Sequence, residues 1–438
     1  MSVKAASSLH TRAQPDSPTQ ERVLDRAAEL FWTKGYAATT TRQIAASLGI
    51  RQASLYHHFA SKDDLLGKLC VSSVEELIRC VSSAIRESDC PEARLRILMS
   101  AHLDTLLKYQ TRHALMLTEL RALKGVWRER VLGLRKQYAK LVCGVIEDGQ
   151  RAGFLRTDVP SKYLTLALLN ILNRAVLWFR DDEALAPGQL AALFARVYIE
   201  GAASSGARAV MPLPNLRPQP APRRRKAVRV LHEPVMTRLL DTAAVLFARQ
   251  SYALTSTREI AAQVGIQKAS LYYHIETKED LLYEICKSAI QQIRADSEAA
   301  LERASNPLER TAMLIRAHIE SLLLAHDRHL AALADMSSLS DRRRAEVAAL
   351  RDGYEALVRS VLEQGQTSGA LRRDVPVKYL CLALLGLLNR VLVWFRPAGP
   401  LSPGQIGALF ANIYVTGAAS VGPTASLPPG RSPGLPPP

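Results

Sequence analysis

The sequence has few cysteines, and none is placed to hold a metal. Only 6 occur among 438 residues, without a C-x-x-C pair or a histidine at the spacing of zinc ligands. No nucleophile–base pair or glycine-rich phosphate loop appears either, so we expect neither an enzyme nor a cofactor. So few cysteines suit a reducing compartment.

The sequence also lacks an apolar run long enough to cross a bilayer. The two longest runs, Tyr163–Phe179 and Tyr379–Phe395, have about 17 residues each, whereas a spanning helix needs roughly 20. Each run also contains an asparagine and an arginine. The N-terminal segment has no apolar core of a secretory signal. These absences predict a soluble, cytoplasmic protein without a membrane partner.

Acidic residues are fewer than basic residues. Lysine and arginine total 57 against 41 acidic residues, which gives a net charge of +16. This excess indicates a polyanionic partner, with nucleic acid first and an anionic membrane surface second, although basicity can also serve solubility alone. The hydrophobic share of 48% is ordinary for a globular chain and excludes a wholly disordered one.

An internal repeat organises the chain. Motif residues recur without a gap at a constant offset of 216 positions, as Tyr36 does in Tyr252. Further pairs at this offset are Ile44 and Ile260, Gly49 and Gly265, Tyr56 and Tyr272, His102 and His318, Asn173 and Asn389, and Trp178 and Trp394. A period this long indicates a whole domain duplicated in tandem.

Proline and charge mark the boundaries between the copies. A proline-rich stretch that ends in the basic run Arg223–Lys226 predicts an extended linker, and this run either touches DNA phosphates or is simply solvated. The expected organisation is a disordered N-terminus (1–18), a first DNA-binding domain (19–66) and regulatory domain (67–203), the linker (204–233), a second DNA-binding domain (234–282) and regulatory domain (283–420), and a disordered tail (421–438).

Apolar residues follow helical spacing in both copies and no strand alternation is sustained, so the expected fold class is all-α. Thr40-x-x-Gln43 is a capping box that opens a short helix, which Gly49 ends. A second short helix is expected over Gln52–Phe59. Longer helices are expected over about 61–88, 92–109, 112–123, 126–151, 160–180 and 188–203.

Two short helices joined by a glycine turn have the layout of a helix-turn-helix DNA-binding unit. Leu55 and Phe59 would anchor the second helix, which leaves Arg51, Gln52, Ser54, Tyr56, His57 and His58 on its exposed side. Arginine and glutamine suit guanine and adenine edges, and hydroxyls and imidazoles suit phosphates. On spacing alone, an ordinary helical hairpin is the alternative.

The segment YAATTTRQIAASLGIRQASLYHHFASKDDLL (Tyr36–Leu66) resembles the DNA-binding segment of tetracycline-repressor (TetR) family regulators. The segment YALTSTREIAAQVGIQKASLYYHIETKEDLL (Tyr252–Leu282) resembles it again. The shared motifs are long and ungapped, and the likeness continues more weakly through each copy. It implies two tandem TetR-like repeats, each a three-helix DNA-binding domain followed by a helical ligand-binding and dimerisation domain.

The resemblance implies roles for particular residues. Contacts with the DNA backbone are implied for Thr39, Tyr56, His57 and Lys62, and for Thr255, Tyr272, Tyr273 and Lys278. Base contacts are implied for Thr41, Arg51 and Gln52, and for Thr257, Gln267 and Lys268. A lysine at the start of a helix also suits phosphate because a helix N-terminus favours an anion.

Two substitutions distinguish the second copy. Gly35 becomes Ser251, which loses an easy left-handed cap, and Phe59 becomes Ile275, a smaller core anchor. Both put the rigidity of the second DNA-binding domain in question. We expect it still to bind DNA, because its phosphate-contacting residues persist.

Members of that family are two-fold dimers that place recognition helices in successive major grooves, about 34–36 Å apart. Two copies in one chain therefore imply an intrachain pseudo-dimer, built from Leu164–Phe179 and 188–203 against 376–396 and 404–419. Its operator would be an imperfect palindrome, because the two recognition helices differ. Association of two chains as a homodimer through matching copies stays open.

Each copy ends with Leu-Asn-Arg-x-x-x-Trp-Phe-Arg. Asparagine and arginine inside an apolar helix are costly unless they are paired or face a cavity, so this ending indicates either a ligand pocket or a polar interface pair beside a core tryptophan. The candidate pocket residues are His102, Asn173, Trp178, His318, Asn389 and Trp394. Together with the following L-[AS]-P-G-Q, the ending resembles TetR-type regulators that sense fatty acids or acyl-coenzyme A thioesters.

The resemblance and the basic charge predict a transcriptional repressor that binds a double-stranded DNA operator and a small-molecule effector. The effector would change the spacing of the two DNA-binding domains and release DNA, as a population shift between two states. The alternatives are a helical interaction module or an enzyme whose DNA-binding unit is a relic. Activation rather than repression is open.

Overall fold

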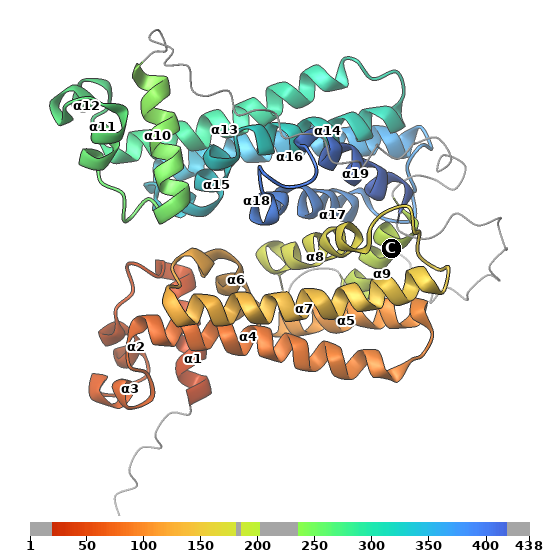
Figure 1. Ribbon diagram of the computed structural model, residues 1–438, viewed down its shortest axis with the longest axis horizontal. Helices are drawn as coiled ribbons and strands as arrows, with labels where there is room; N and C mark the ends of the chain where they lie inside the picture. Colours follow the sequence, from red (N-terminus) through yellow and green to blue (C-terminus); the bar gives the residue numbers. More distant parts are fainter. Residues whose placement is uncertain (1–19, 181–184, 202–234, 418–438) are drawn as a thin grey trace, which may run out of the picture.

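The computed structural model of the protein describes residues 20–180, 185–201 and 235–417, and these ranges contain helices and no strand. The first repeat (20–201) and the second repeat (235–417) form two halves that lie side by side (Figure 1). The segments expected to be disordered or to link the copies, 1–18, 204–233 and 421–438, lie outside the described residues, as does the basic run within the linker.

The first repeat begins with a small DNA-binding domain and continues into a bundle of longer helices. Its helices are α1 (Gln20–Lys34), α2 (Thr41–Ser47), α3 (Gln52–His58), α4 (Lys62–Ala84), α5 (Pro91–Lys108), α6 (Gln110–Thr118), α7 (Gly125–Arg151), α8 (Ser161–Trp178) and α9 (Pro187–Glu200). Short 3-10 helices, η1 (Ile85–Glu87) and η2 (Glu119–Arg121), follow α4 and α6. These elements agree with the expected helices to within a few residues.

The second repeat has the same order of elements with one interruption. Its helices are α10 (Val235–Gln250), α11 (Thr257–Val264), α12 (Lys268–His274), α13 (Lys278–Leu301), α14 (Pro307–Leu324), α15 (His326–Asp335), α16 (Asp341–Thr367), α17 (Val377–Asn389), α18 (Val391–Trp394) and α19 (Pro403–Thr416), with η4 (Met336–Ser338) after α15. Arg390 separates α17 from α18, whereas α8 is continuous.

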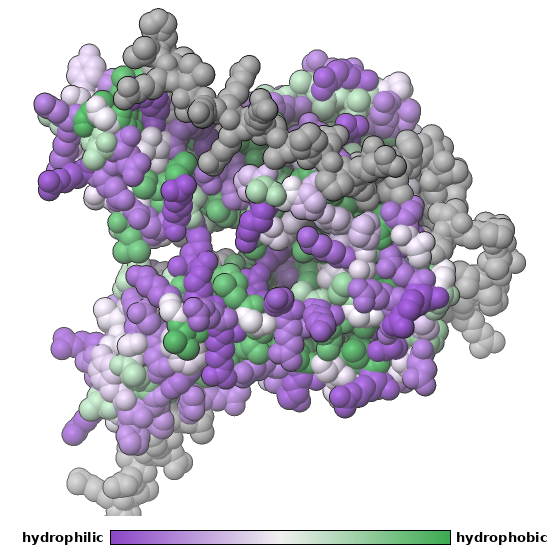
Figure 2. Space-filling model, in the orientation of Figure 1, coloured by the Kyte–Doolittle hydropathy of each residue, from purple (hydrophilic) through white to green (hydrophobic). Residues whose placement is uncertain are grey.

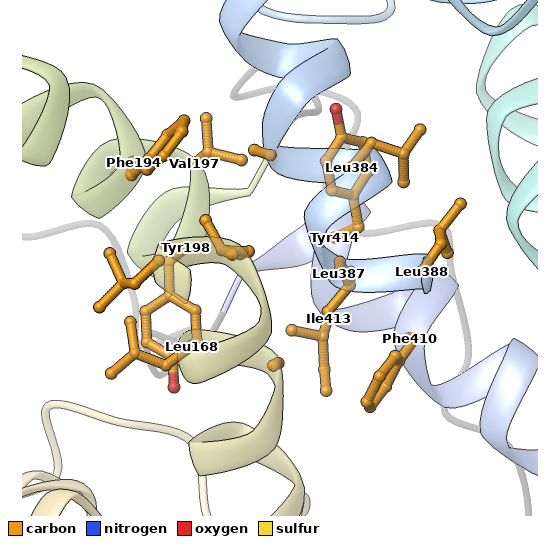
Figure 3. Packing of buried hydrophobic residues seen from close by; sticks show 14 of the residues in the cluster. Leu168, Phe194, Val197, Tyr198, Leu384, Leu387, Leu388, Phe410, Ile413 and Tyr414 are labelled. Carbon is orange, nitrogen blue, oxygen red and sulfur yellow. The ribbon is translucent and has the colours of Figure 1, made fainter. Parts of the chain in front are cut away.

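The two repeats are joined by the helices that the sequence proposes for dimerisation. α8 packs against α17, and α9 and α19 complete a four-helix arrangement. Figure 3 shows Leu168 and Tyr198 on one side and Leu387 and Tyr414 on the other, all in one hydrophobic core. Gly386 permits the close crossing, because a Cβ there would lie 3.1 Å from the Asn170 carbonyl oxygen. In this structure the two repeats of one chain therefore pack against each other through these four helices.

Polar contacts surround this interface with different chemistry on its two sides. Arg156 donates to Asn412 Oδ1 at 2.8 Å and to Thr416 Oγ1 at 2.9 Å. On the opposite side, Arg372 donates to Glu200 Oε2 at 2.9 Å. One side is thus held by hydrogen bonds to neutral groups and the other by an ion pair, so the pseudo-symmetry is not complete.

Within the part of the chain that the structure describes, one helical segment is long and apolar enough to span a membrane. Val377–Trp394, which covers α17 and α18, has a mean hydropathy of 1.6, yet 61% of it is buried inside the molecule. Its neighbours include α8, α14 and α16. We interpret it as a core helix of the interface.

Candidate DNA-binding surface and ligand cavity

Local signals hold the first DNA-binding domain in shape. The backbone N–H of Gln43 donates to Thr40 Oγ1 at 3.2 Å, and the Thr40 N–H donates to Gln43 Oε1 at 2.8 Å, which completes the capping box of α2. Gly49 follows with φ of 69°, a left-handed conformation that glycine adopts without steric cost. Leu55 and Phe59 are buried, so α3 lies against the core and turns its opposite face outward.

That outer face carries side chains expected to contact DNA. Arg51 and His57 are exposed, and Tyr56 is 47% exposed. The hydroxyl of Thr41 lies 3.1 Å from the Tyr56 hydroxyl, and Gln52 Nε2 donates to Thr41 Oγ1 at 2.9 Å. The structure thus brings three predicted contact residues into one hydrogen-bonded group. Hydroxyl and amide groups of this kind can meet phosphates and base edges, but their contact with DNA stays a prediction.

The second DNA-binding domain keeps two of the three members of this group and replaces the third. The hydroxyls of Thr257 and Tyr272 lie 3.2 Å apart, as in the first repeat. At the position of the glutamine stands Lys268, whose Nζ lies 5.7 Å from the centre of the Tyr272 ring. Gln267 and Tyr273 are exposed beside it. The two recognition helices therefore share a scaffold and offer different chemistry.

Thr39 and Thr255 are buried, with 0% and 2% exposure, and their hydroxyls are engaged inside their own domains, while their contact with the DNA backbone stays a prediction. Thr39 Oγ1 donates to the carbonyl of Gly35 at 2.9 Å, and Thr255 Oγ1 donates to that of Ser251 at 2.8 Å. These threonines close the turn that positions the following short helix.

Lys62 and Lys278 are engaged inside their own domains. Lys62 Nζ donates to the carbonyls of Tyr36 and Thr39 at 2.9 and 3.0 Å, and Lys278 makes the equivalent bonds at 2.7 and 2.8 Å. Burial lowers the pKa of both ammonium groups. In this structure the lysines brace the loop before the short helices, and their phosphate contact stays a prediction.

The two substitutions in the second DNA-binding domain leave its geometry in place. Ser251 adopts φ of 77°, close to the 84° of Gly35, and is the one non-glycine with a positive φ among the described residues. Ile275 is buried, as Phe59 is. The domain therefore keeps its shape at a conformational cost, because a side chain disfavours the left-handed region.

A cavity of about 300 Å³ lies in the regulatory part of the second repeat, and one of its side chains comes from the first repeat. Its apolar walls include Ile290, Ile293, Leu322, Met336, Val347 and Leu392. Its polar lining includes His318, Tyr354, Asn389, Arg351 and, from α8 of the first repeat, Arg174.

The predicted pocket residues divide between the cavity and the packed core. His318 and Asn389 line the cavity, but Trp394 does not, because its ring packs against Phe410 with the centres 5.8 Å apart. Asn389 of this ending thus lines the cavity and Trp394 belongs to the packed core, while a ligand-binding role of the cavity stays a prediction. Sequence reasoning missed the contribution of Arg174 across the interface, although the cost of an arginine in an apolar helix was a signal for it.

The equivalent residues of the first repeat are arranged alike. His102 Nδ1 lies 2.6 Å from the Tyr138 hydroxyl, with the Asn173 carboxamide beside the imidazole. Trp178 packs edge-on against Phe194, with the ring centres 6.3 Å apart. The tryptophan of each repeat therefore serves packing rather than the cavity.

Burial sets the charge state of the cavity's polar groups. His318 Nδ1 lies 2.7 Å from the Tyr354 hydroxyl, and burial lowers the pKa of His318 to about 3, so its imidazole is neutral. Its Nε2 has no hydrogen-bond partner of good geometry, although the Asn389 carboxamide lies beside it. Burial, with Arg351 nearby, lowers the pKa of Arg174 to about 10, which leaves it charged. The cavity thus offers two neutral imidazoles, those of His318 and His329, and the guanidinium groups of Arg174 and Arg351 beside the acidic side chains of Asp352 and Glu355, within apolar walls.

The described residues contain no group of three His, Cys, Asp or Glu side chains placed to hold a metal ion. Burial raises the pKa of the Cys70, Cys286 and Cys381 thiols to about 12. Thiols of this kind are poor nucleophiles, because the thiolate is the reactive form.

Two helix-turn-helix domains, each with an exposed recognition helix on a helical body, define a DNA-binding transcriptional regulator. The chain belongs to the tetracycline-repressor family. The family described as "Bacterial regulatory proteins, tetR family" matches residues 23–69 and 239–285, and "Tetracyclin repressor-like, C-terminal domain" matches 88–202 and 304–418. Each repeat therefore carries both domains of the family.

Known relatives match about one repeat each. The chain is 28% identical over 193 residues to the HTH-type transcriptional repressor KstR2 of Mycobacterium tuberculosis. The matched region covers 42% of this chain and 92% of that protein. It is 23% identical over 167 residues to the fatty acid metabolism regulator protein of Bacillus subtilis, covering 38% and 86%. Among solved structures, the TetR family regulator PfmR from Thermus thermophilus is 33% identical, covers 41% of this chain and 98% of its own, and has a TM-score of 0.39.

Proposed function

We propose that this regulator is a ligand-released repressor that binds its operator as an intrachain pseudo-dimer. The observation that carries the proposal is the α8–α17 interface, which joins the repeats and leaves α3 and α12 at the same end of the molecule (Figure 1). Two recognition helices on one body suit successive major grooves. A homodimer through matching repeats is the alternative, because the DNA-binding domain of each repeat has a core of its own, although the regulatory parts share one core.

The operator has unlike halves. Arg51 and Gln52 begin the first recognition helix, and Gln267 and Lys268 begin the second. Arginine and lysine favour guanine whereas glutamine favours adenine, so the preferred bases are offset between the halves. We assign DNA binding to 19–66 and 234–282 and regulation to 67–203 and 283–420, boundaries that stay predictions.

The effector is a fatty acid or an acyl-coenzyme A thioester. Apolar walls suit an acyl chain, and the guanidinium of Arg174 suits a carboxylate, a phosphate or a polarised thioester oxygen at its end. The name of one relative, the fatty acid metabolism regulator protein of Bacillus subtilis, supports this class. The protein itself has no catalytic activity, works in the cytoplasm and uses no membrane.

A contact between the repeats links the cavity to the second DNA-binding domain. Figure 2 shows an opening between the two halves, and nearer the DNA-binding end the halves meet again. There Arg121 of η2 donates to the carbonyls of Phe247 and Ala248 at the end of α10, and lies 3.6 Å from Asp335. Met336, the next residue, lines the cavity. A ligand that shifts α15 would disturb this contact and change the spacing of the recognition helices.

A gel-shift titration on DNA upstream of the protein's own gene tests the proposal. We expect preference over random DNA at physiological salt and release by a long-chain acyl-coenzyme A. The variant Arg51→Ala should weaken binding about tenfold only where the first half-site is intact. Gln267→Ala is the matched control for the other half.

The alternatives make different predictions in the same titration. A relic DNA-binding unit in an interaction module or an enzyme predicts no preference for any promoter, and this result would overturn the proposal. Tighter binding on addition of the acyl-coenzyme A would contradict ligand release and indicate an activator or a corepressed protein.

A further inference from the structure

We infer that each chain has a single effector site, in the second repeat, and that the corresponding space in the first repeat is closed by its own side chains. This inference rests on the proposed function, since it concerns the site that would receive the effector. It deepens that function because one ligand would then control two DNA-binding domains.

Small residues leave room in the second repeat. Ala332 of α15 and Ala348 of α16 line the cavity of about 300 Å³ from two helices. Neither side chain extends beyond Cβ, so the space between these helices is left to a ligand. A volume of this size is at the lower end of known small-molecule pockets.

Larger residues occupy the equivalent positions of the first repeat. Met116 stands where the second repeat has Ala332, whereas Leu132, at the position of Ala348, is 41% exposed, so Met116 is the residue that fills the interior. Met116 is 3% exposed and packs in the hydrophobic cluster of the first repeat, with Leu115 and Val131. Its flexible side chain takes the space that an alanine leaves open.

A second pair of positions, outside the lining of the cavity, also differs between the repeats. In the first repeat, Trp127 of α7 packs directly on Gly67 of α4, where a Cβ would lie only 2.3 Å from the indole. In the second repeat, Tyr283 replaces the glycine, and Arg343 replaces the tryptophan with its guanidinium 5.3 Å from the phenol ring. The Trp127 indole thus packs directly on the backbone of α4, whereas α13 and α16 contact each other through the Tyr283 phenol and the Arg343 guanidinium.

The polar chemistry does not explain the difference. Among the described residues, the Nε2 atoms of His102 and His318 have no hydrogen-bond partner of good geometry. Each repeat also receives an arginine from the other: Arg174 lines the cavity of the second repeat, and Arg390 lies close enough to His102 to add to the lowering of its pKa by burial. The first repeat thus keeps polar groups of a binding site but fills its space. The repeats differ instead in the volume of the side chains at equivalent interior positions.

The test measures how many ligands one chain binds. Full-length protein is titrated with dodecanoyl-coenzyme A by calorimetry and, separately, with 8-anilinonaphthalene-1-sulfonate, an anionic aromatic probe that reports an apolar cavity by its fluorescence. We expect one molecule of each per chain. Ala332→Met, which places the first repeat's residue in the second, should weaken both by about tenfold or more, because a filled cavity cannot admit the probe.

Matched variants keep the result decisive. Met116→Leu conserves volume in the first repeat and should leave stoichiometry and affinity unchanged. Melting curves confirm folding, and Ala348→Leu replaces Ala332→Met if the latter does not fold. Two probe molecules per chain, or binding that survives both filling variants, would overturn the inference, as would no binding of either probe. Promoter preference is measured separately. A protein that binds one probe molecule per chain but prefers no promoter over random DNA would contradict the proposed function and leave the single-site inference standing.

Discussion

Individual buried side chains set how the regulatory halves respond to pH. Burial lowers the pKa of His102 and His318 to about 3 and of His113 and His329 to about 4. All four are neutral when folded, whereas in the unfolded chain they titrate near their ordinary value of about 6.5. Between these values the unfolded state binds more protons, so protons favour unfolding.

We therefore predict that stability is complete above about pH 6.5 and falls as the pH drops towards 4, by roughly 1–2 kcal/mol for each histidine at about pH 5. Melting temperatures at about pH 7.5 and 5 measure this. His318→Gln should reduce the slope, and His57→Gln, at an exposed position on α3, should not. A melting temperature that is flat over this range would contradict the assignment of neutral histidines.

A second prediction at this scale concerns the strained serine before α11. Ser251 has φ of 77°, where an L-residue with a side chain is disfavoured by roughly 1–2 kcal/mol. Ser251→Gly should raise the free energy of unfolding by about 1 kcal/mol, because the added freedom of glycine in the unfolded chain offsets part of the gain. Gly35→Ser is the reciprocal control and should lower it. Chemical denaturation measures both, and equal signs for the two variants would refute the argument.

At the scale of elements, the two repeats are built alike but do not contact each other symmetrically. Arg121 of η2 reaches α10 and α15 of the second repeat, whereas its counterpart in the second repeat is Ser337. Only one side of the molecule therefore has this arginine between a regulatory half and the other repeat's DNA-binding domain. Burial raises the pKa of Asp335, and Arg121 counters it.

Arg121→Ser should loosen the spacing of α3 and α12. We expect operator affinity to fall several-fold and the protein to tolerate added base pairs between the half-sites, because the second DNA-binding domain loses a fixed position. Gel shifts on operators of varied spacing measure this. Arg130→Ser is the control, since Arg130 pairs with Glu75 on the surface of the first repeat alone. An unchanged spacing preference in Arg121→Ser would rule out this role.

At the scale of the whole molecule, the crossing of α8 and α17 favours pairing between unlike repeats. Asn170 Nδ2 donates to the Leu387 carbonyl at 3.1 Å, and at the equivalent position of α17 stands Gly386, pressed against α8. A residue with a polar side chain thus meets a residue with none. Two like repeats would instead place two asparagines or two glycines at the crossing.

We predict that the protein is a single chain in solution and that this crossing is sensitive to size. Gly386→Leu should lower the free energy of unfolding by about 1–3 kcal/mol, because its side chain would enter a space where a Cβ already lies 3.3 Å from Arg174 Cβ. Gly133→Leu on α7, where nothing lies within 4 Å, should not. Light scattering gives the mass, and the mass of two chains for the unmodified protein would contradict the intrachain pseudo-dimer.

The sequence by itself determined what depends on near neighbours along the chain. Helical periodicity and the Thr40 capping box predicted the short helices, and Gly49 predicted the turn between them. The constant offset of 216 positions revealed the duplication. Such features need only a few consecutive residues, whose preferences are readable in one sequence.

Only the tertiary structure decided which groups are buried, paired or shared between repeats. Thr39 is buried, and Lys62 donates hydrogen bonds to carbonyls more than twenty positions away. Arg174 lines a cavity formed by the other repeat. These outcomes depend on packing across hundreds of positions, and a side chain's periodicity does not report which distant atoms surround it. The same holds for the cavity of the second repeat, which depends on the combined volume of side chains from several helices.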